Sequence, residues 1–193
     1  MARWGFGMAV QLRRHRFTTD DYHRLGEAGI LGEDDRVELI DGEIVEMNPI
    51  GGPHLGSVNR INHLFVRSVG DRAVVHVQNP IRLDEHSEPQ PDVCLLRVRA
   101  DFYASGPPGP ADVLLLIEVS DSSLTYDRQV KLPLYARGGI PEAWVLDLGH
   151  NRLLVFREPV DGGYATTQVL RRGQSIRPLA FPDLAVAVAA LLG

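Results

Sequence analysis

The sequence has few of the features that build disulfide-stabilised or membrane-spanning proteins. Only one of its 193 residues is a cysteine, Cys94, which excludes an internal disulfide and a zinc site made of cysteines. The longest apolar run, 113–119, is interrupted by Glu118 and is far shorter than the roughly 18 to 20 residues that span a bilayer. Residues 1–16 lack the apolar stretch and cleavage site of a secretion signal, so we expect a cytoplasmic protein.

Excess positive charge is also absent. The chain carries 20 Lys and Arg against 25 Asp and Glu, a net charge of −5, which argues against nonspecific coating of nucleic acid by counterion release. A metal-dependent nuclease stays compatible, because it gathers carboxylates at its centre and keeps arginines on its rim. Acids gather between Glu33 and Glu46, and arginines at 13–16, 97–99 and 171–177. Each cluster alone is more typical of a solvated surface.

Aromatic residues make up only 7% of the chain, which gives little support to a glycoside hydrolase built on two carboxylates. There is no helix-turn-helix or zinc module, so any base specificity would come from loops, with 51–54 and 105–110 the first candidates. Internal repeats and low-complexity linkers are absent as well. We therefore expect a single domain over 17–193, preceded by an N-terminal extension, 1–16.

The spacing of apolar residues predicts a mixed α/β fold. Thr18 and Asp21 resemble a capping box and predict a helix over 17–28, and Asp41-Gly42 between two strand-like runs predicts a hairpin. Apolar positions 55, 58, 61, 65 and 69 predict an amphipathic helix. Strands are predicted at 73–77, 81–83, 92–96, 113–119, 142–146, 153–157 and 164–170, with a helix over 127–137 that contains Pro133 and an apolar tail, 184–192, packed on the core. The unalternating run 114–117 within the predicted strand 113–119 is typical of a strand buried on both faces.

Two carboxylates stand at predicted strand ends. Asp92 follows Pro91 at the start of one strand, and Glu118 lies near the end of the buried strand. A carboxylate at the end of an apolar strand is costly to desolvate, so it needs a cation, a hydrogen-bond network or water beside it. If the strands are neighbours, the two acids converge and, with the carbonyl of Val119, supply the hard oxygen ligands that Mg²⁺ or Mn²⁺ requires.

Lys131 is the candidate cation for the same site. A helix starting near Asp127 would carry its ammonium back to the strand ends, beside a scissile phosphate. Phosphodiester hydrolysis needs an activated water and stabilisation of developing negative charge, and a metal with a lysine supplies both. Glu38 and His54 are weaker candidates for this cleft. Each residue also has a structural interpretation: Glu38 on the solvent face of a hairpin strand, Lys131 on a solvated helix face, Asp127 as a helix cap, His54 at a helix start, and Tyr135 and Trp144 in the core.

Several short segments together resemble one known family. They are Val37-Glu38-Leu39-Ile40-Asp41-Gly42-Glu43, His54, Pro91-Asp92-Val93, Ile117-Glu118-Val119-Ser120, Asp127, Lys131, Tyr135-Ala136, Gly139-Ile140-Pro141-Glu142 and 144–147. This combination resembles the Uma-two-like family, long treated as a domain of unknown function and described as restriction endonucleases. The resemblance covers about residues 17 to 185.

The resemblance implies the PD-(D/E)XK nuclease fold, a restriction-endonuclease-like central mixed sheet flanked by helices, with antiparallel strands toward the C-terminus. Asp92 and Glu118 would bind Mg²⁺ or Mn²⁺, Glu38 matches an acidic position of the family, and DNA would be the substrate. Ser120 stands two residues after Glu118, where lysine is usual, and Lys131 would replace that lysine. A catalytically silent module that binds nucleic acid or a protein is the alternative. A homodimer is expected if both strands of a duplex are cut.

Overall fold

The computed structural model describes residues 14–32 and 34–193. Outside the described residues lie Glu33 and most of the predicted N-terminal extension, 1–16, including Trp4 and Arg13. The helices are α1 (Thr19–Glu27), α2 (Gly52–Val69), α3 (Leu124–Tyr126), α4 (Leu132–Arg137) and α5 (Val188–Leu192), with short 3₁₀ turns η1 (Gly70–Arg72) and η2 (Pro110–Asp112) and a π-helical segment η3 (Asp127–Lys131). The strands are β1 (Val37–Ile40), β2 (Glu43–Glu46), β3 (Val74–Val77), β4 (Val93–Leu96), β5 (Val113–Ser120), β6 (Glu142–Asp147), β7 (Arg152–Val160), β8 (Gly163–Arg171), β9 (Ser175–Ile176) and β10 (Val186–Ala187).

A six-stranded mixed sheet forms the centre of the fold, in the order β3-β4-β5-β6-β7-β8. Only β5 and β6 pair in parallel, and α3, η3 and α4 make the crossover between them. The other neighbours are antiparallel, including β6, β7 and β8 toward the C-terminus. The α/β fold with a mixed central sheet and antiparallel C-terminal strands is therefore confirmed.

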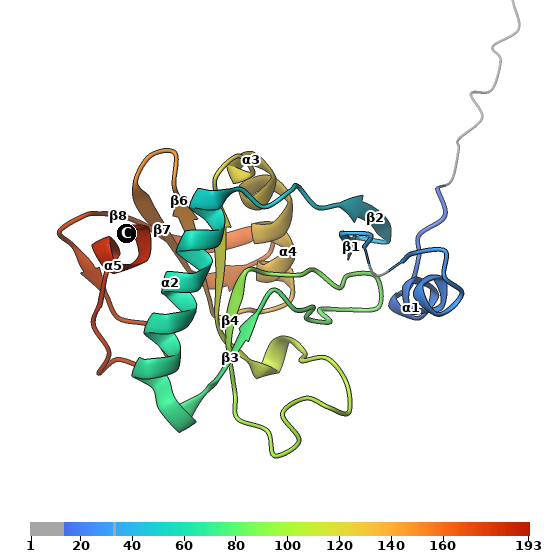
Figure 1. Cartoon of the computed structure of the whole chain (residues 1–193), viewed down its shortest axis with the longest axis horizontal. Helices are drawn as coiled ribbons and strands as arrows, with labels where there is room; N and C mark the ends of the chain where they lie inside the picture. The colour runs from blue at the N-terminus through green and yellow to red at the C-terminus, as the bar shows by residue number, and fades with distance from the viewer. Residues whose placement is uncertain (1–13, 33) are drawn as a thin grey trace, which may run out of the picture.

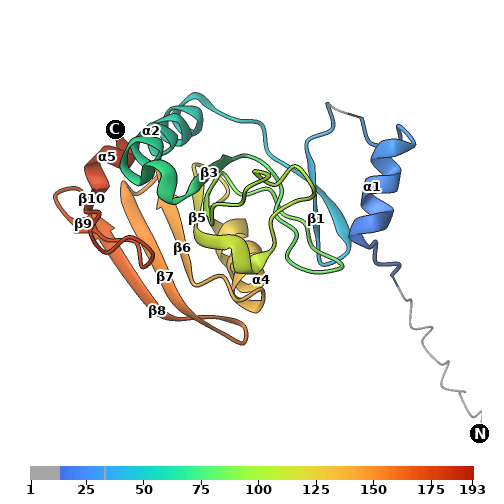
Figure 2. The same ribbon diagram turned by 90° about the horizontal axis from the view of Figure 1, so that it is seen from below.

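Helices cover both faces of the sheet, as the view in Figure 2 shows. Leu115, Ile117 and Val119 of β5 join the core beneath α2 and α5, whereas Leu116 joins the core beneath α4. Because successive side chains of a strand point to opposite faces, both sets must be apolar. This explains the unalternating run in β5, and it places Glu118 on the α4 face.

The predicted hairpin and first helix are both present, at the end of the molecule occupied by α1 in Figure 1. Thr18 and Asp21 form a capping box at the start of α1. Asp41 and Gly42 both have positive φ, 50° and 80°, as the tight turn between β1 and β2 requires. Buried Glu88 contacts His23 Nε2 at 2.7 Å and Arg82 Nε at 3.1 Å, which fastens α1 to the rest of the protein.

Two details of the sequence prediction were wrong. Segment 81–83 belongs to no strand, because Ile81 and Leu83 donate their backbone N–H groups to Pro89 and Ser87 in a local turn. Leu55 lies on the helix as expected but is 50% exposed, since the apolar residues that α2 buries are Val58, Ile61, Phe65 and Val69. The first error arises from a local turn, and the second from the way α2 packs on the sheet.

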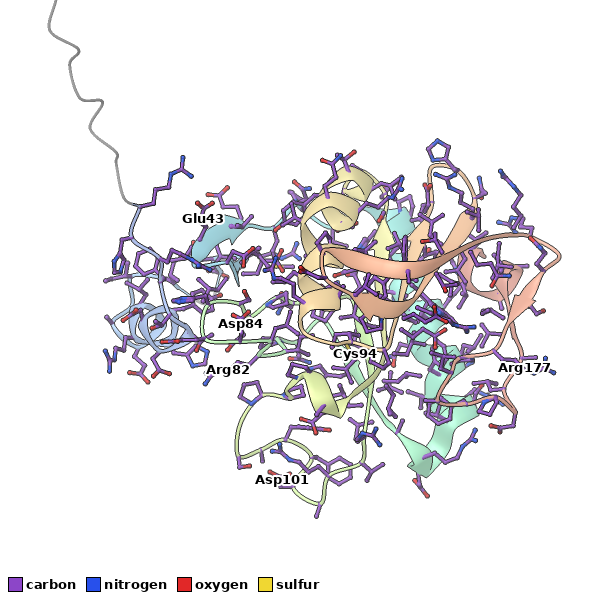
Figure 3. The ribbon with its side chains drawn as sticks, turned by 180° about the vertical axis from the view of Figure 1, so that it is seen from behind. Glu43, Arg82, Asp84, Cys94, Asp101 and Arg177 are labelled. Atoms are coloured by element: carbon purple, nitrogen blue, oxygen red, sulfur yellow. The ribbon has the colours of Figure 1, made fainter. Side chains whose placement is uncertain are left out.

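The cysteine, the loop after β4 and the lengths of the helices complete the description of the fold. Cys94 is fully buried in β4 and lies in the centre of the molecule in Figure 3. In the same view, Asp101 marks the outer part of the loop that follows β4. Asp101 accepts hydrogen bonds from Arg99, which orders this loop. Within the described ranges, no helix is long and apolar enough to cross a membrane.

Candidate active site

Pairing between β4 and β5 brings the two predicted carboxylates together. Val93 lies opposite Ile117, so Asp92 and Glu118 occupy the next positions along the two strands. The backbone N–H of Asp92 lies 3.4 Å from Glu118 Oε2, and the N–H of Val119 donates to Asp92 Oδ2 at 2.8 Å. The N–H and C=O of one strand residue point to the same edge, so the Val119 carbonyl also faces the Asp92 side.

Glu118 is almost completely buried, at 3% exposure, on the face covered by α4. Its Oε1 accepts hydrogen bonds from Lys131 Nζ at 3.2 Å and from the Tyr135 hydroxyl. Burial raises the pKa of Glu118 to about 8, although the neighbouring Lys131 ammonium acts in the opposite direction. A positive charge beside Glu118 therefore strongly stabilises its ionised form.

A widened helical turn delivers Lys131 to this carboxylate. The N–H of Leu132 donates to the carbonyl of Asp127, five residues earlier, so the segment Asp127–Lys131 is π-helical. Leu132 separates it from Pro133, whose ring would clash with the carbonyl four residues back in a regular helix. The ring is thus accommodated without ending the helix, and the side chain of Lys131 points inward.

The Lys131 ammonium lies between two carboxylates, 3.2 Å from Glu38 Oε2 and 3.2 Å from Glu118 Oε1. Its side chain is only 6% exposed, so the interpretation of Lys131 as part of a solvated helix face was wrong. Burial disfavours the ammonium, but the charges of Glu118 and Glu38 outweigh this effect and raise the pKa of Lys131 above its ordinary value. Lys131 is therefore held as a cation.

Glu38 joins the same cluster from strand β1. It is 3% exposed and accepts hydrogen bonds from the Gln90 backbone N–H at 3.0 Å and the Tyr126 hydroxyl at 3.2 Å. The solvent-face interpretation of Glu38 was wrong because segment 88–90 lies over β1, joined to it by the bond from Glu88 N–H to the Leu39 carbonyl.

Asp127 and Ser120 form a pair beside the lysine. The hydroxyls of Ser120 and Ser123 both donate to Asp127 Oδ2, at 2.5 and 2.7 Å. Burial raises the pKa of Asp127, while these two hydrogen bonds lower it, with a net increase. Because the helical segment begins at Leu124, Asp127 is not its N-cap, and Ser120 ties the end of β5 to the crossover through the Asp127 carboxylate.

His54, in the first turn of α2, contacts Asp92 from the opposite side. Its Nε2 lies 3.1 Å from the carboxylate, and this hydrogen bond raises the pKa of His54 against the effect of burial. Gln78 Nε2 approaches the other Asp92 oxygen at 3.3 Å. The buried Nδ1 atom of His54 has no hydrogen-bond partner among the described residues.

Most of these side chains, among them Asp92, Glu118 and Lys131, line one cavity of about 300 Å³. Its walls come from the β1–β2 hairpin, the connection to α2, the ends of β4 and β5, and the segment 121–131. Its acidic members are Glu38, Glu46, Asp92, Glu118, Asp121 and Asp127, and its permanent cations within the described ranges are Arg36 and Lys131. The cavity therefore has a large excess of carboxyl groups, which favours a bound cation.

The donor set fits a magnesium-type ion. Among the described residues, no three or more His, Cys, Asp or Glu side chains are grouped as a ready-made metal site. Asp92 and Glu118 nevertheless offer two carboxylates side by side, with the Val119 carbonyl beside them. Mg²⁺ typically takes one or two protein carboxylates and keeps several waters, so this smaller set of hard oxygen donors is sufficient.

Three residues around the cavity escaped sequence reasoning. Tyr135 was assigned only to the core, but its hydroxyl donates to Glu118, and its position four residues after Lys131 places both on one helix face. Tyr126 carried no signal that it would reach Glu38. Arg36 was counted only within the predicted hairpin, and its place on the cavity wall depends on how the hairpin folds over the sheet.

Comparison with known proteins identifies relatives of the chain. A profile of the family Uma2, described as "Putative restriction endonuclease", matches residues 19–189. A solved structure from Anabaena variabilis, described as a "putative nuclease belonging to DUF820", has a TM-score of 0.68 and 16% sequence identity, and the match covers 91% of this chain and 97% of that one. At this identity the structural likeness shows the fold alone. No curated protein matches the sequence.

Proposed function

Because the chain belongs to the Uma2 family, we propose that it is a metal-dependent endonuclease that hydrolyses DNA phosphodiester bonds at the cavity formed by Asp92, Glu118 and Lys131. One observation carries the proposal. The ammonium of Lys131 lies 3.2 Å from Glu118, although it comes from a helix and not from the position two residues after Glu118. The required acid pair and cation thus share one site.

Asp92, Glu118 and the Val119 carbonyl would hold the metal ion. Such an ion, when bound, supplies Lewis acidity for the phosphate oxygen and lowers the pKa of water that attacks phosphorus. Glu118 is kept in position by the Tyr135 hydroxyl, and Asp92 by His54 and the Val119 N–H. Both carboxylates therefore have fixed orientations before any ligand binds.

The role of Lys131 is electrostatic. In hydrolysis, the oxygen of a water forms a bond to phosphorus, the bond from phosphorus to the leaving oxygen breaks, and that oxygen takes up a proton. Negative charge accumulates on the phosphate oxygens on the way, and a buried ammonium close to them stabilises it more strongly than in water. Glu38 holds Lys131 from the second side, so we assign it a positioning role.

Arg36 offers a second phosphate contact. It is exposed on the hairpin and lines the cavity, and its Nη1 donates to the Asn48 carbonyl at 3.1 Å, which leaves its other nitrogens without a partner among the described residues. A guanidinium is well suited to bind a phosphate next to the one being cut. This arrangement favours an extended polyanionic substrate such as DNA.

The decisive experiment compares cleavage by the wild type with that by Asp92→Asn and Glu118→Gln. Plasmid DNA and single-stranded DNA are incubated with Mg²⁺ or Mn²⁺, and metal binding is measured by calorimetry on the same samples. Glu46→Gln is the matched control, because Glu46 is an exposed carboxylate on the wall of the same cavity. We expect metal binding and cleavage to be lost in the first two variants and kept in the control. Normal cleavage by both Asp92→Asn and Glu118→Gln would exclude this site.

A catalytically silent nuclease fold is the second candidate. It is favoured by the pairing of Lys131 with two carboxylates at once, which would leave its ammonium unable to contact a phosphate. Binding of DNA by the wild type, with no cleavage in Mg²⁺ or Mn²⁺, would establish this alternative. Sedimentation with and without duplex DNA would test the expected two-fold pair.

A further inference from the structure

Helix α2 differs from the rest of the chain in charge. It has 18 residues, including Arg60 and Arg67 together with His54 and His63, and no Asp or Glu. The whole protein contains 25 acidic residues among 193, so an acid-free helix of this length is unusual for it. Asn59, His63 and Arg67 are exposed on its outer surface. This outer surface is therefore a local region of positive and neutral polar groups on an acidic protein.

An open groove of about 520 Å³ lies along this helix, beside α5. Its lining includes Asn59, Arg60, His63, Leu64, Arg67 and Ala190. Figure 1 shows α2 crossing one face of the sheet with α5 beside it. Arg60 is fixed on the wall, since its Nη2 donates to Ser57 Oγ and to the Leu192 carbonyl, both at 2.9 Å. No ion pair to Arg67 occurs within the described part of the chain, which leaves its guanidinium available.

Helix α2 connects the groove to the candidate active site, although no residue lines both. His54, in the first turn of the helix, lines the catalytic cavity, and Arg67 lies near the other end. Thirteen residues separate them, which corresponds to about 20 Å along a helix. A DNA strand advances about 3.4 Å per nucleotide along its axis, so the groove lies within about six nucleotides of the site.

We propose that the groove between α2 and α5 binds the phosphate backbone of the nucleic-acid substrate outside the active site. The inference rests on the proposed function, which requires DNA at the α2 N-terminus. Guanidinium, imidazole and amide side chains are the groups that usually contact phosphates, and the absence of carboxylates on α2 removes the main source of repulsion. The exposed side chains Leu55 and Val66 on the same helix make a second copy of the chain the competing occupant.

The test is a salt titration of DNA binding. A labelled duplex of about 30 base pairs of arbitrary sequence is bound in EDTA, which prevents cleavage, from about 50 to 200 mM salt. Arg67→Ala, Arg67→Lys and Arg24→Ala are compared with the wild type. Arg24 is the matched control, since it is a highly exposed arginine on α1, 76% exposed, away from α2. We expect Arg67→Ala to weaken binding to all sequences and to reduce the slope of log K against log salt by about 1. Arg67→Lys and Arg24→Ala should keep the wild-type slope.

Three outcomes would overturn the proposal. An unchanged slope in Arg67→Ala, or an equal change in Arg24→Ala, would show that DNA does not lie in the groove. Dissociation of a dimer by Arg67→Ala in sedimentation, with DNA binding unchanged, would assign the groove to a second copy. Cleavage measured separately in Mg²⁺ distinguishes the two hypotheses. If the wild type cleaves DNA but Arg67→Ala keeps the wild-type salt slope, only the groove proposal is refuted. If Arg67→Ala reduces the slope but the wild type does not cleave DNA, the groove proposal stands and the nuclease proposal is refuted.

Discussion

Replacing Lys131 by methionine should destabilise the protein because Lys131 is the cation between two buried carboxylates. Its Nζ lies 3.2 Å from Glu38 and from Glu118, and both partners are about 3% exposed. Methionine keeps most of the side-chain volume, so the change removes charge without creating a large cavity. Breaking a buried ion pair by removing one partner costs about 3 to 5 kcal/mol, and here two carboxylates lose their shared partner.

Urea unfolding in EDTA at about pH 9, above the pKa of about 8 of Glu118, measures this cost with both carboxylates ionised. With a slope of about 2 kcal/mol per molar urea, the midpoint should fall by about 1.5 to 2.5 M. The double variant Lys131→Met/Glu118→Gln should recover part of the loss, because one of the two uncompensated charges is then removed. A loss of less than about 1 kcal/mol in Lys131→Met, outside the usual range for a buried pair, would refute the idea that Lys131 compensates this cluster.

Three further predictions concern the same cavity. Arg36→Ala should raise KM by about tenfold with kcat little changed, since it removes a phosphate contact made equally in the ground and transition states. Steady-state cleavage of a short duplex measures both constants, and a fall in kcat alone would contradict the prediction. Tyr135→Phe should lower the free energy of unfolding by about 1.5 to 3 kcal/mol, because the hydroxyl donates to a buried carboxylate, and urea unfolding checks the value. Removal of divalent ions with EDTA should stop cleavage while leaving the circular dichroism spectrum unchanged, and loss of the spectrum would indicate a structural metal instead.

The sequence allowed the sheet and the acid pair to be predicted for identifiable reasons. Asp41-Gly42 is a local turn signal, and the run 114–117 is apolar without alternation, so the hairpin and the central strand required no knowledge of distant contacts. Asp92 and Glu118 stand at the ends of two successive strands, and such strands are usually neighbours. The side-by-side placement of the two acids follows from this local information.

The surroundings of the acid pair could not be predicted in the same way. Glu38 is buried because segment 88–90 lies over β1, and Tyr126 reaches Glu38 across 88 residues of sequence. Segment 81–83 has a strand-like composition, but local and loop contacts take up its N–H groups. Such contacts are set by tertiary packing, which composition and periodicity do not encode.

The π-helical turn at Asp127–Lys131 also sets the rotational phase of the crossover helix. Each residue of an α-helix advances about 100° around the axis, so one extra residue in the turn rotates everything after it by about that angle. The extra residue reduces the rotation over the eight residues from Leu124 to Leu132 from about 800° to about 700°, close to two full turns, and both side chains pack on the same core. Insertion or deletion of a single residue here would turn Lys131, Leu134 and Tyr135 away from their partners together. The length of this five-residue segment is consequently as constrained as its composition.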